Sequence, residues 1–217
     1  MKKQLLFFVT VGVCGYLVPG CSRTVTAGAG SSGELPDNAR MVNLVWKPTM
    51  SGKDLDSEPL ALYKSTGVSF LSVADVRENP RIIGKTFDDL KVRTTTVPVA
   101  TRVNVARWCR TAFENTCREI NVKSDNTKKS IHLEIEITGF SINDDYTQTG
   151  TVSLQINALT GEGMLIWEGT ITGTSDLYVH GSDSDGISEC LSNTMMVTLH
   201  NVLTDRSFCD AVEKSIE

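Results

Sequence analysis

Cysteine and histidine are the residues of this 217-residue chain best suited to chemistry, with six of the first and three of the second. A cysteine nucleophile works as a thiolate and needs a base such as histidine beside it. No local sequence signature joins a cysteine to His132, His180 or His200. No Cys-x-x-Cys or His-x-x-x-His spacing occurs either. The pattern therefore predicts neither a cysteine enzyme nor a zinc site.

Four cysteines, Cys109, Cys117, Cys190 and Cys209, lie in the part of the chain expected to fold. In an oxidising compartment an even number suggests disulfides. Cys109 and Cys117 fall about 12 Å apart on one predicted helix, too far for a bridge. A parallel arrangement of helices suggests Cys109 with Cys190 and Cys117 with Cys209. Four buried free thiols are one alternative, and a hydrolase or redox protein that uses Cys190 or Cys209 is another.

Two acidic segments resemble ligand-binding loops in composition only. Asp183-Ser184-Asp185-Gly186 lacks the third ligand and the twelfth-position glutamate of a calcium loop, so we expect it to cap the next helix. Asp144-Asp145 is typical of the solvated tip of a hairpin. The sequence contains no phosphate-binding glycine loop and no nucleophile elbow. We therefore expect no catalytic residue, no metal and no cofactor.

The first 20 residues have the layout of a secretory signal peptide. Met1-Lys2-Lys3 is cationic, and the run from Leu5 to Leu17 is uncharged and rich in Leu, Phe and Val. This run has about 13 residues, whereas a helix needs about 20 to cross the hydrocarbon core. We expect residues 1–20 to be removed and not retained as a transmembrane anchor.

The segment Val18-Pro19-Gly20-Cys21 resembles the lipobox of bacterial lipoproteins. The resemblance implies cleavage after Gly20, a diacylglyceryl thioether on Cys21 and a further acyl chain, such as palmitate, on the freed amine. Several acyl chains give stable anchoring where one gives only marginal binding. Ser22 replaces the aspartate that retains enteric-type lipoproteins at the inner membrane, so the periplasmic face of the outer membrane is favoured. The alternative is an ordinary secretory signal that leaves Cys21 as a thiol.

The charge balance excludes a broad nucleic-acid-binding surface. The chain has 21 Lys+Arg against 26 Asp+Glu, a formal charge of −5, whereas binding phosphates needs clustered basic residues. Removal of Lys2 and Lys3 with the signal peptide leaves 19 basic against 26 acidic residues, a charge of −7. Anionic lipid headgroups repel such a body, so we expect the acyl chains alone to hold it at the bilayer.

Residues 21–40 are predicted to be the lipidated cysteine and a flexible tether, and residues 41–217 a single α+β periplasmic domain. Apolar periodicity predicts strands at Val42–Trp46, Gly67–Ala74, Ile131–Ile142 with a bulge at Gly139, Val152–Ala158 and Leu165–Ile171. It predicts helices that begin at Val99 and Ile187 with a short extension from Ser207, and a loop with at most a short strand at Gly84–Val97. We expect two layers: a mixed, mainly antiparallel sheet of four to five strands, covered on one face by two helices.

Short motifs in this domain resemble the YajG-like bacterial lipoproteins. They are Asp75-Val76-Arg77, the following Ile83-Gly84, the long helix, and the hairpin from Tyr146 and Gly150-Thr151-Val152-Ser153-Leu154 to Trp167-Glu168-Gly169. The resemblance covers about Val42 to Val202 and implies a periplasm-facing lipoprotein without catalytic residues. The auxiliary lipoproteins of ABC-type lipid and toluene-tolerance transport systems have a similar layout. A lipid-handling role of that kind predicts a deep apolar groove between helices and sheet.

We therefore expect a membrane-anchored, non-catalytic binding or assembly module. Its expected partners are the lipid bilayer, through acylated Cys21, and an envelope protein, but no nucleic acid. The predicted contact is the strand at Val42–Trp46, because unpaired backbone groups at a sheet edge can accept an added strand. Trp46 and Trp108 are candidate anchors, with core packing as the alternative. The rival functions are an auxiliary lipoprotein of an ABC-type lipid or export system and a cysteine-dependent periplasmic enzyme.

Overall fold

The computed structural model describes residues 35–56, 58–87, 95–127, 129–144, 147–178 and 184–216. The described residues belong to one compact unit. The predicted signal peptide, the lipobox with Gly20 and Cys21, and most of the predicted tether lie outside the described residues, as does His180. What the sequence predicts for them stays a prediction.

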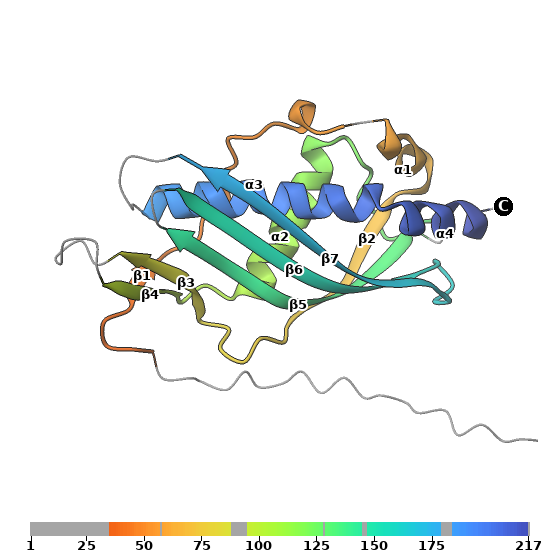
Figure 1. Cartoon of the computed structure of the whole chain (residues 1–217). Helices are drawn as coiled ribbons and strands as arrows, with labels where there is room; N and C mark the ends of the chain where they lie inside the picture. Colours follow the sequence, from red (N-terminus) through yellow and green to blue (C-terminus); the bar gives the residue numbers. More distant parts are fainter. Residues whose placement is uncertain are drawn as a thin grey trace, which may run out of the picture. The chain divides into compact units, whose positions relative to one another are not determined.

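A seven-stranded sheet forms one layer of the fold (Figure 1). Its strands are β1 (Arg40–Val42), β2 (Val68–Asp75), β3 (Ile82–Phe87), β4 (Thr96–Thr101), β5 (Ile131–Asp144), β6 (Gln148–Leu159) and β7 (Leu165–Leu177). The order is β1-β4-β3-β5-β6-β7, and β2 also pairs with β5. The long ladders β5–β6 and β6–β7 are antiparallel, while β1–β4, β2–β5 and β3–β5 are parallel. The sheet is mixed, as predicted, but it has more strands than the four to five expected.

Strand β5 lies at the centre and uses its two edges differently. Along one edge it pairs with β6 over nearly its full length. Along the other it pairs first with β2, up to Ile137, and then with β3, from Ile142 onward. The register with β6 shifts between Ile137 and Gly139, which confirms the predicted bulge at Gly139.

Strands β3 and β4 replace the two ends of the loop predicted at Gly84–Val97 and the first residues of the predicted helix. Val99 pairs with Arg40 of β1 and with Gly84 of β3, so it belongs to the sheet. The helix begins at Val105 and not at Val99, with the Oδ1 of Asn104 accepting the backbone N–H of Arg107 at 2.8 Å. Buried residues of β4 happen to fall at helical spacing from the stripe of the helix, and periodicity alone extends the helix too far.

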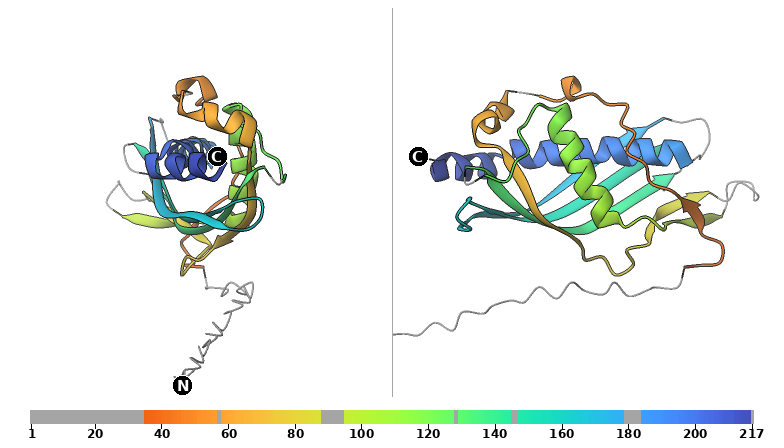
Figure 2. Two further views of the ribbon diagram at one scale, coloured as in Figure 1. Left: turned by 90° about the vertical axis from the view of Figure 1, so that its right-hand side faces the viewer. Right: turned by 180° about the vertical axis from the view of Figure 1, so that it is seen from behind.

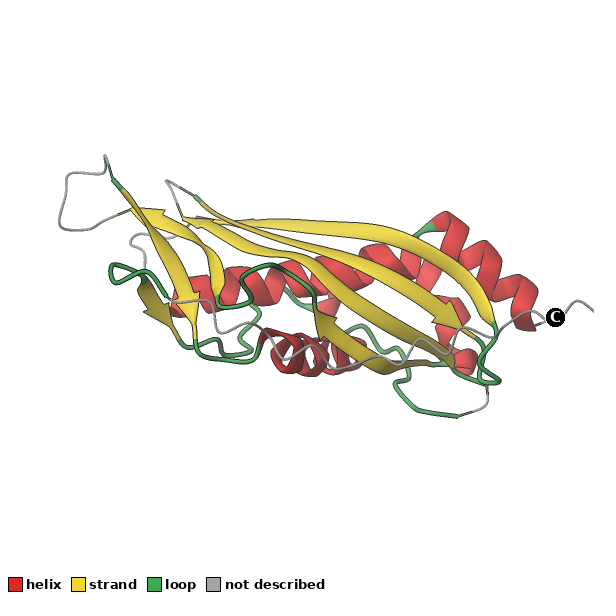
Figure 3. Ribbon diagram, turned by 90° about the horizontal axis from the view of Figure 1, so that it is seen from below, coloured by secondary structure: helices red, strands yellow, loops and turns green. Residues whose placement is uncertain are grey.

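Helices form the second layer (Figures 2 and 3). They are α1 (Tyr63–Thr66), α2 (Val105–Glu119), α3 (Ser184–Thr204) and α4 (Arg206–Ile216), with 3₁₀ turns at Gly52–Asp54 and Pro59–Leu62. The described part of the chain thus has four α-helices where two were predicted, and the expected short extension after Ser207 is the 11-residue α4. In the end-on view of Figure 2 the strands curve around α3.

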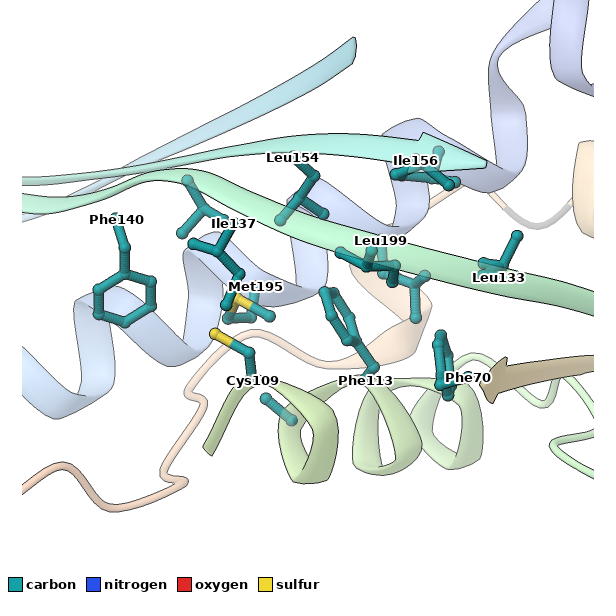
Figure 4. Close-up of a cluster of buried hydrophobic side chains, with 14 of the residues drawn as sticks. Phe70, Cys109, Phe113, Leu133, Ile137, Phe140, Leu154, Ile156, Met195 and Leu199 are labelled. Carbon is teal, nitrogen blue, oxygen red and sulfur yellow. The ribbon is translucent and has the colours of Figure 1, made fainter. Parts of the chain in front are cut away.

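Apolar side chains fill the space between the two layers (Figure 4). Those fully buried there include Leu133 and Ile137 of β5, Leu154 and Ile156 of β6, Phe113 of α2, and Met195 and Leu199 of α3. Phe113 stacks on Phe70 of β2 with 5.3 Å between ring centroids. These buried side chains fill the region between β5, β6, α2 and α3, where a lipid-handling role predicts a deep apolar groove.

Candidate interaction surface

The predicted contact at Val42–Trp46 is not a free edge strand. Strand β1 ends at Val42, and residues 43–56, here called the covering segment, run along α3. The backbone N–H of Lys47 donates to Ser192 Oγ at 3.0 Å, and those of Thr49 and Met50 both donate to Asn193 Oδ1 at 3.0 Å. These three amides follow the predicted strand. Of Val42–Trp46 only Val42 belongs to a strand, so the predicted strand is wrong beyond that residue, while docking of a partner at this end of the sheet stays a prediction.

The covering segment explains why α3 is buried almost all round. The polar side chains of Ser188, Ser192 and Asn193 are buried. They form hydrogen bonds with the backbone of the covering segment, and the N–H of Val45 also donates to Ser188 Oγ, at 3.3 Å. Buried polar groups need partners, and polar residues inside the predicted helix were the available sequence signal for such a neighbour.

Trp46 and Trp108, the two candidate anchors, belong to the core. Their ring centroids lie 6.3 Å apart, and Trp108 also meets Phe140 edge-on at 5.7 Å. Trp108 is 7% exposed, and Trp46 is partly buried against the same cluster. Core packing, the alternative left open by the sequence, is therefore the observed arrangement.

Arg77 closes the gap between β2 and β3 along the edge of β5. It donates to both carboxylate oxygens of Asp75, from Nε at 2.8 Å and Nη2 at 2.6 Å. Its guanidinium also donates to the carbonyls of Pro80 at 2.8 Å and of Ile82 and Phe140 at 2.9 Å each. Both charged side chains are only 9% exposed. The Asp75-Val76-Arg77 motif is thus a structural clasp.

Strand β7 forms the other end of the sheet and runs for 13 residues. Within the described ranges no strand pairs with its outer edge. From Trp167 onward its odd-numbered side chains face the helices: Trp167 Nε1 donates to Ser207 Oγ at 2.9 Å, and Ser175 Oγ lies 2.7 Å from Thr194 Oγ1. Because side chains alternate along a strand, the even-numbered ones point to the uncovered face of the sheet.

The backbone of β7 alternates in the same way. In an antiparallel ladder, residues that bond to the partner strand alternate with residues whose N–H and C=O point away. The carbonyl of Thr172 accepts a hydrogen bond from Nδ2 of Asn201 on α3 at 3.2 Å, so Thr172 belongs to the second kind. By alternation the backbone groups of Glu168, Thr170, Thr174 and Asp176 also point outward. The side chains of these five residues all lie on the uncovered face.

The uncovered face is acidic and rich in hydroxyl groups. It carries four exposed carboxylates: Glu134 and Glu136 of β5 and Glu168 and Asp176 of β7. Strands β5, β6 and β7 contain no Lys or Arg at all. Between the carboxylates, Ser153 Oγ lies 2.9 Å from Thr172 Oγ1, and Thr149 donates to Asp176 at 2.6 Å. Within β5, β6 and β7 the face therefore carries carboxylates and no Lys or Arg side chain.

The cysteines of the described residues are all free thiols. Cys190 Sγ donates to the carbonyl of Gln148 on β6 at 3.2 Å, and Cys209 Sγ lies 3.7 Å from the hydroxyl of Tyr63 on α1. Because these two sulfurs point to β6 and to α1, the suggested bridges from Cys190 to Cys109 and from Cys209 to Cys117 are not formed. The structure therefore has the free-thiol alternative.

Burial governs the acidity of these thiols. It raises the pKa of Cys117 to about 12 and that of Cys190 to about 11, and it also raises the pKa values of Cys109 and Cys209. A nucleophilic cysteine needs a lowered pKa to be a thiolate at neutral pH. These four thiols stay protonated there, which disfavours a role as nucleophile.

The two described histidines contact backbone carbonyls. His132 Nε2 lies 3.2 Å from the carbonyl oxygen of Thr127, and His200 Nε2 lies 2.8 Å from that of Asp56. In the part of the chain that the structure describes, no three His, Cys, Asp or Glu side chains come together in a way that could hold a metal ion. Among these same residues no helix has both the length and the apolar character needed to span a membrane.

Comparison with known proteins gives distant likenesses only. No family model and no curated protein matches the chain. A Xanthomonas campestris protein of family DUF330 is 9% identical, with a TM-score of 0.43 over 82% of this chain and 97% of that one. PelC from Paraburkholderia phytofirmans, solved as a dodecamer, is 14% identical, with a TM-score of 0.37 over 65% and 88%. Lipoprotein GNA1162 from Neisseria meningitidis is 13% identical, with a TM-score of 0.21 over 53% and 88%. Likenesses at this level establish neither a family nor a function.

Proposed function

We propose that this protein is a lipid-anchored, non-catalytic module of the bacterial envelope that binds a partner protein by strand addition at β7. The observation that carries the proposal is the edge of β7, where five alternate residues direct their backbone groups outward, toward an incoming strand. The anchor is the acylated Cys21, and the residues up to 40 tether the folded body at the periplasmic face of the outer membrane.

The remaining features of the body support a binding role over the two rivals. The raised pKa values of the four thiols disfavour a cysteine-dependent enzyme. The filled interior disfavours an auxiliary role in which a lipid chain lies between helices and sheet. An edge strand, in contrast, needs no cavity, since main-chain hydrogen bonds supply the affinity and alternate side chains the specificity.

Site-specific photo-crosslinking in the native envelope tests the docking edge. A photoreactive residue at Thr174 is expected to capture one envelope protein, and the same residue at exposed Arg81 is not. Adding Thr170→Pro, which removes one outward N–H, should abolish capture at Thr174. Equal capture from Arg81, or capture at Thr174 that survives the proline, would contradict docking at β7.

The anchor is tested separately. Cys21→Ala should abolish incorporation of labelled palmitate and move the protein from the membrane fraction to the soluble periplasmic fraction. Cys14→Ala, which alters the other cysteine of the signal region, is the matched control and should leave both unchanged. A Cys21→Ala protein that stays with the outer membrane would show that lipid does not hold it there.

A further inference from the structure

We propose that the strand added to β7 is a cationic, amphipathic segment of about nine residues, with Lys or Arg at its two ends on the uncovered face. This inference rests on the proposed docking edge and specifies the chemistry of its occupant. It is carried by the placement of Glu168 and Asp176, the first and last of the five outward-facing residues. The two carboxylates stand eight residues apart, about 26 Å at 3.3 Å per residue.

The register of an added strand follows from the backbone. An antiparallel strand bonds to the residues of β7 whose N–H and C=O point outward, and each such residue lies directly opposite one residue of the partner. Positions one and nine of the partner therefore face Asp176 and Glu168. The three positions between them on the same face oppose Thr170, Thr172 and Thr174, where hydroxyl or β-branched side chains pair well.

The charges of Glu168 and Asp176 favour basic residues at the two ends of the added segment. Opposite charges directly across two strands stabilise the pair, and like charges destabilise it. Because β5, β6 and β7 contain no Lys or Arg, and Glu134 and Glu136 lie on the same face, no basic side chain of these three strands competes with an incoming cation. A second copy of this chain fits poorly, because antiparallel pairing of two β7 strands about Thr172 places Glu168 opposite Asp176.

The side chains of the added strand that face the helices should be apolar. Trp167, Ile171 and Leu177 of β7 point toward the helices but stay partly exposed at the rim of the core. Alternate side chains of an added strand would cover that rim, which makes the segment amphipathic. Asn201, which donates to the Thr172 carbonyl, must give up that bond when the strand adds. Asn201→Ala should therefore leave binding unchanged or tighten it.

Synthetic strands test this chemistry on the full-length protein in detergent micelles. The probe is Lys-Val-Thr-Val-Thr-Val-Thr-Val-Lys, N-methylated at the valines so that only one edge can form hydrogen bonds and the peptide cannot stack on itself. Versions with Gln or Glu in place of both lysines are the comparison peptides. We expect the Lys peptide to bind about ten-fold more tightly than the Gln peptide at low salt, with a smaller ratio at high salt.

Two sets of variants complete the test. Glu168→Lys with Asp176→Lys should reverse the preference toward the Glu peptide. Asp37→Lys with Glu78→Lys makes the same change in net charge at exposed sites outside β7 and should leave the preference for Lys intact. Thr170→Pro should abolish binding of all three peptides.

The outcomes separate the two proposals. Equal binding of the three peptides, lost on Thr170→Pro, would overturn the cationic partner and keep strand addition. Binding that ignores Thr170→Pro, or no binding of any peptide, would overturn strand addition itself and this inference with it. Loss of the preference in the control pair would show that net charge alone is sensed, which also overturns the inference.

Discussion

The two sides of the sheet treat their unpaired backbone groups differently. Beside β2 and β3, Arg77 binds the carbonyls of Ile82 and Phe140. In the covering segment, which follows β1, Asn193 accepts the N–H groups of Thr49 and Met50. On the side of β7, five residues direct their backbone groups outward, and the structure shows one carbonyl, that of Thr172, bound by Asn201.

This difference shows that an extended segment near a chain terminus is not by itself a docking edge. What matters is whether its N–H and C=O groups already have partners, because a buried unmade hydrogen bond is costly and the fold supplies one where it can. Natural edges are blunted by coverage or by charge. Here α3 binds the backbone that follows β1, and the edge of β7 carries two carboxylates, Glu168 and Asp176.

Loss of the Arg77–Asp75 clasp should lower the free energy of unfolding more than any other change considered. Replacing Arg77 with Met leaves the carboxylate of Asp75 buried without its partner and three carbonyls without a donor, so Arg77→Met should lower the free energy of unfolding by about 3–5 kcal/mol. Urea denaturation followed by circular dichroism measures this. Arg81→Met, at an exposed site nearby, should cost less than about 0.5 kcal/mol. A small loss for Arg77→Met would mean that β2 and β3 do not depend on this clasp.

Two proline substitutions, one in β6 and one in β7, compare the stability lost in a central strand with that lost at the edge. Gln155 of β6 and Thr170 of β7 face each other across the ladder, and both side chains are exposed. Gln155→Pro removes a bond of the β5–β6 ladder and should cost about 3 kcal/mol or more, whereas Thr170→Pro removes an outward N–H and should cost about 1 kcal/mol. Thermal and urea unfolding decide between them. Similar losses for both variants would show that the N–H of Thr170 has a partner.

Two asparagines eight residues apart on α3 extend the comparison. Asn193→Ala leaves the backbone N–H groups of Thr49 and Met50 without their acceptor and should lower the free energy of unfolding by about 2–4 kcal/mol. Asn201→Ala frees only the carbonyl of Thr172, which water can reach, and should cost less than about 1 kcal/mol. Hydrogen-exchange measurements should also show faster exchange of the Thr49 and Met50 amides in the Asn193→Ala variant. Equal effects on unfolding would remove the distinction between the covering segment and the edge of β7.

The buried thiols predict a small pH effect that is independent of either edge. Burial raises the folded-state pKa of Cys117 to about 12, above the unfolded value of about 8.5. Its contribution to stability is therefore complete below about pH 8.5 and is lost as pH rises toward 12. Between pH 8 and pH 10, Cys117→Ala should reduce the fall in unfolding free energy by about 1–2 kcal/mol, measured under reducing conditions. An unchanged fall would mean that this thiol ionises as readily in the folded state.

Regular periodicity predicted the long central strands and helix α3 correctly. The strands β5 and β6 have the predicted alternation and bulge, and α3 spans the residues where its apolar spacing was found. Prediction failed where short elements carry little pattern. Strand β4 has only six residues, and its buried valine was counted into the helix that follows.

The candidate site was harder to predict than the fold. From the sequence we predicted a docking edge at Val42–Trp46, and the strand predicted at Leu165–Ile171, which is part of β7, was not a candidate. The partners of the covering segment are side chains such as Asn193, 144 residues away from Thr49 in the chain. No local pattern reports such a contact, because hydrogen-bond partners at that separation depend on the assembled core.

The sequence by itself determined the features written in contiguous residues: the predicted signal peptide and lipobox, the acidic balance, and the absence of Lys and Arg from three neighbouring strands. Only the tertiary structure decided which side of the sheet stays open and which way each residue of β7 points. The physical reason is that charge and periodicity are local properties of the chain. The occupancy of a backbone N–H or C=O, in contrast, depends on what the fold brings beside it.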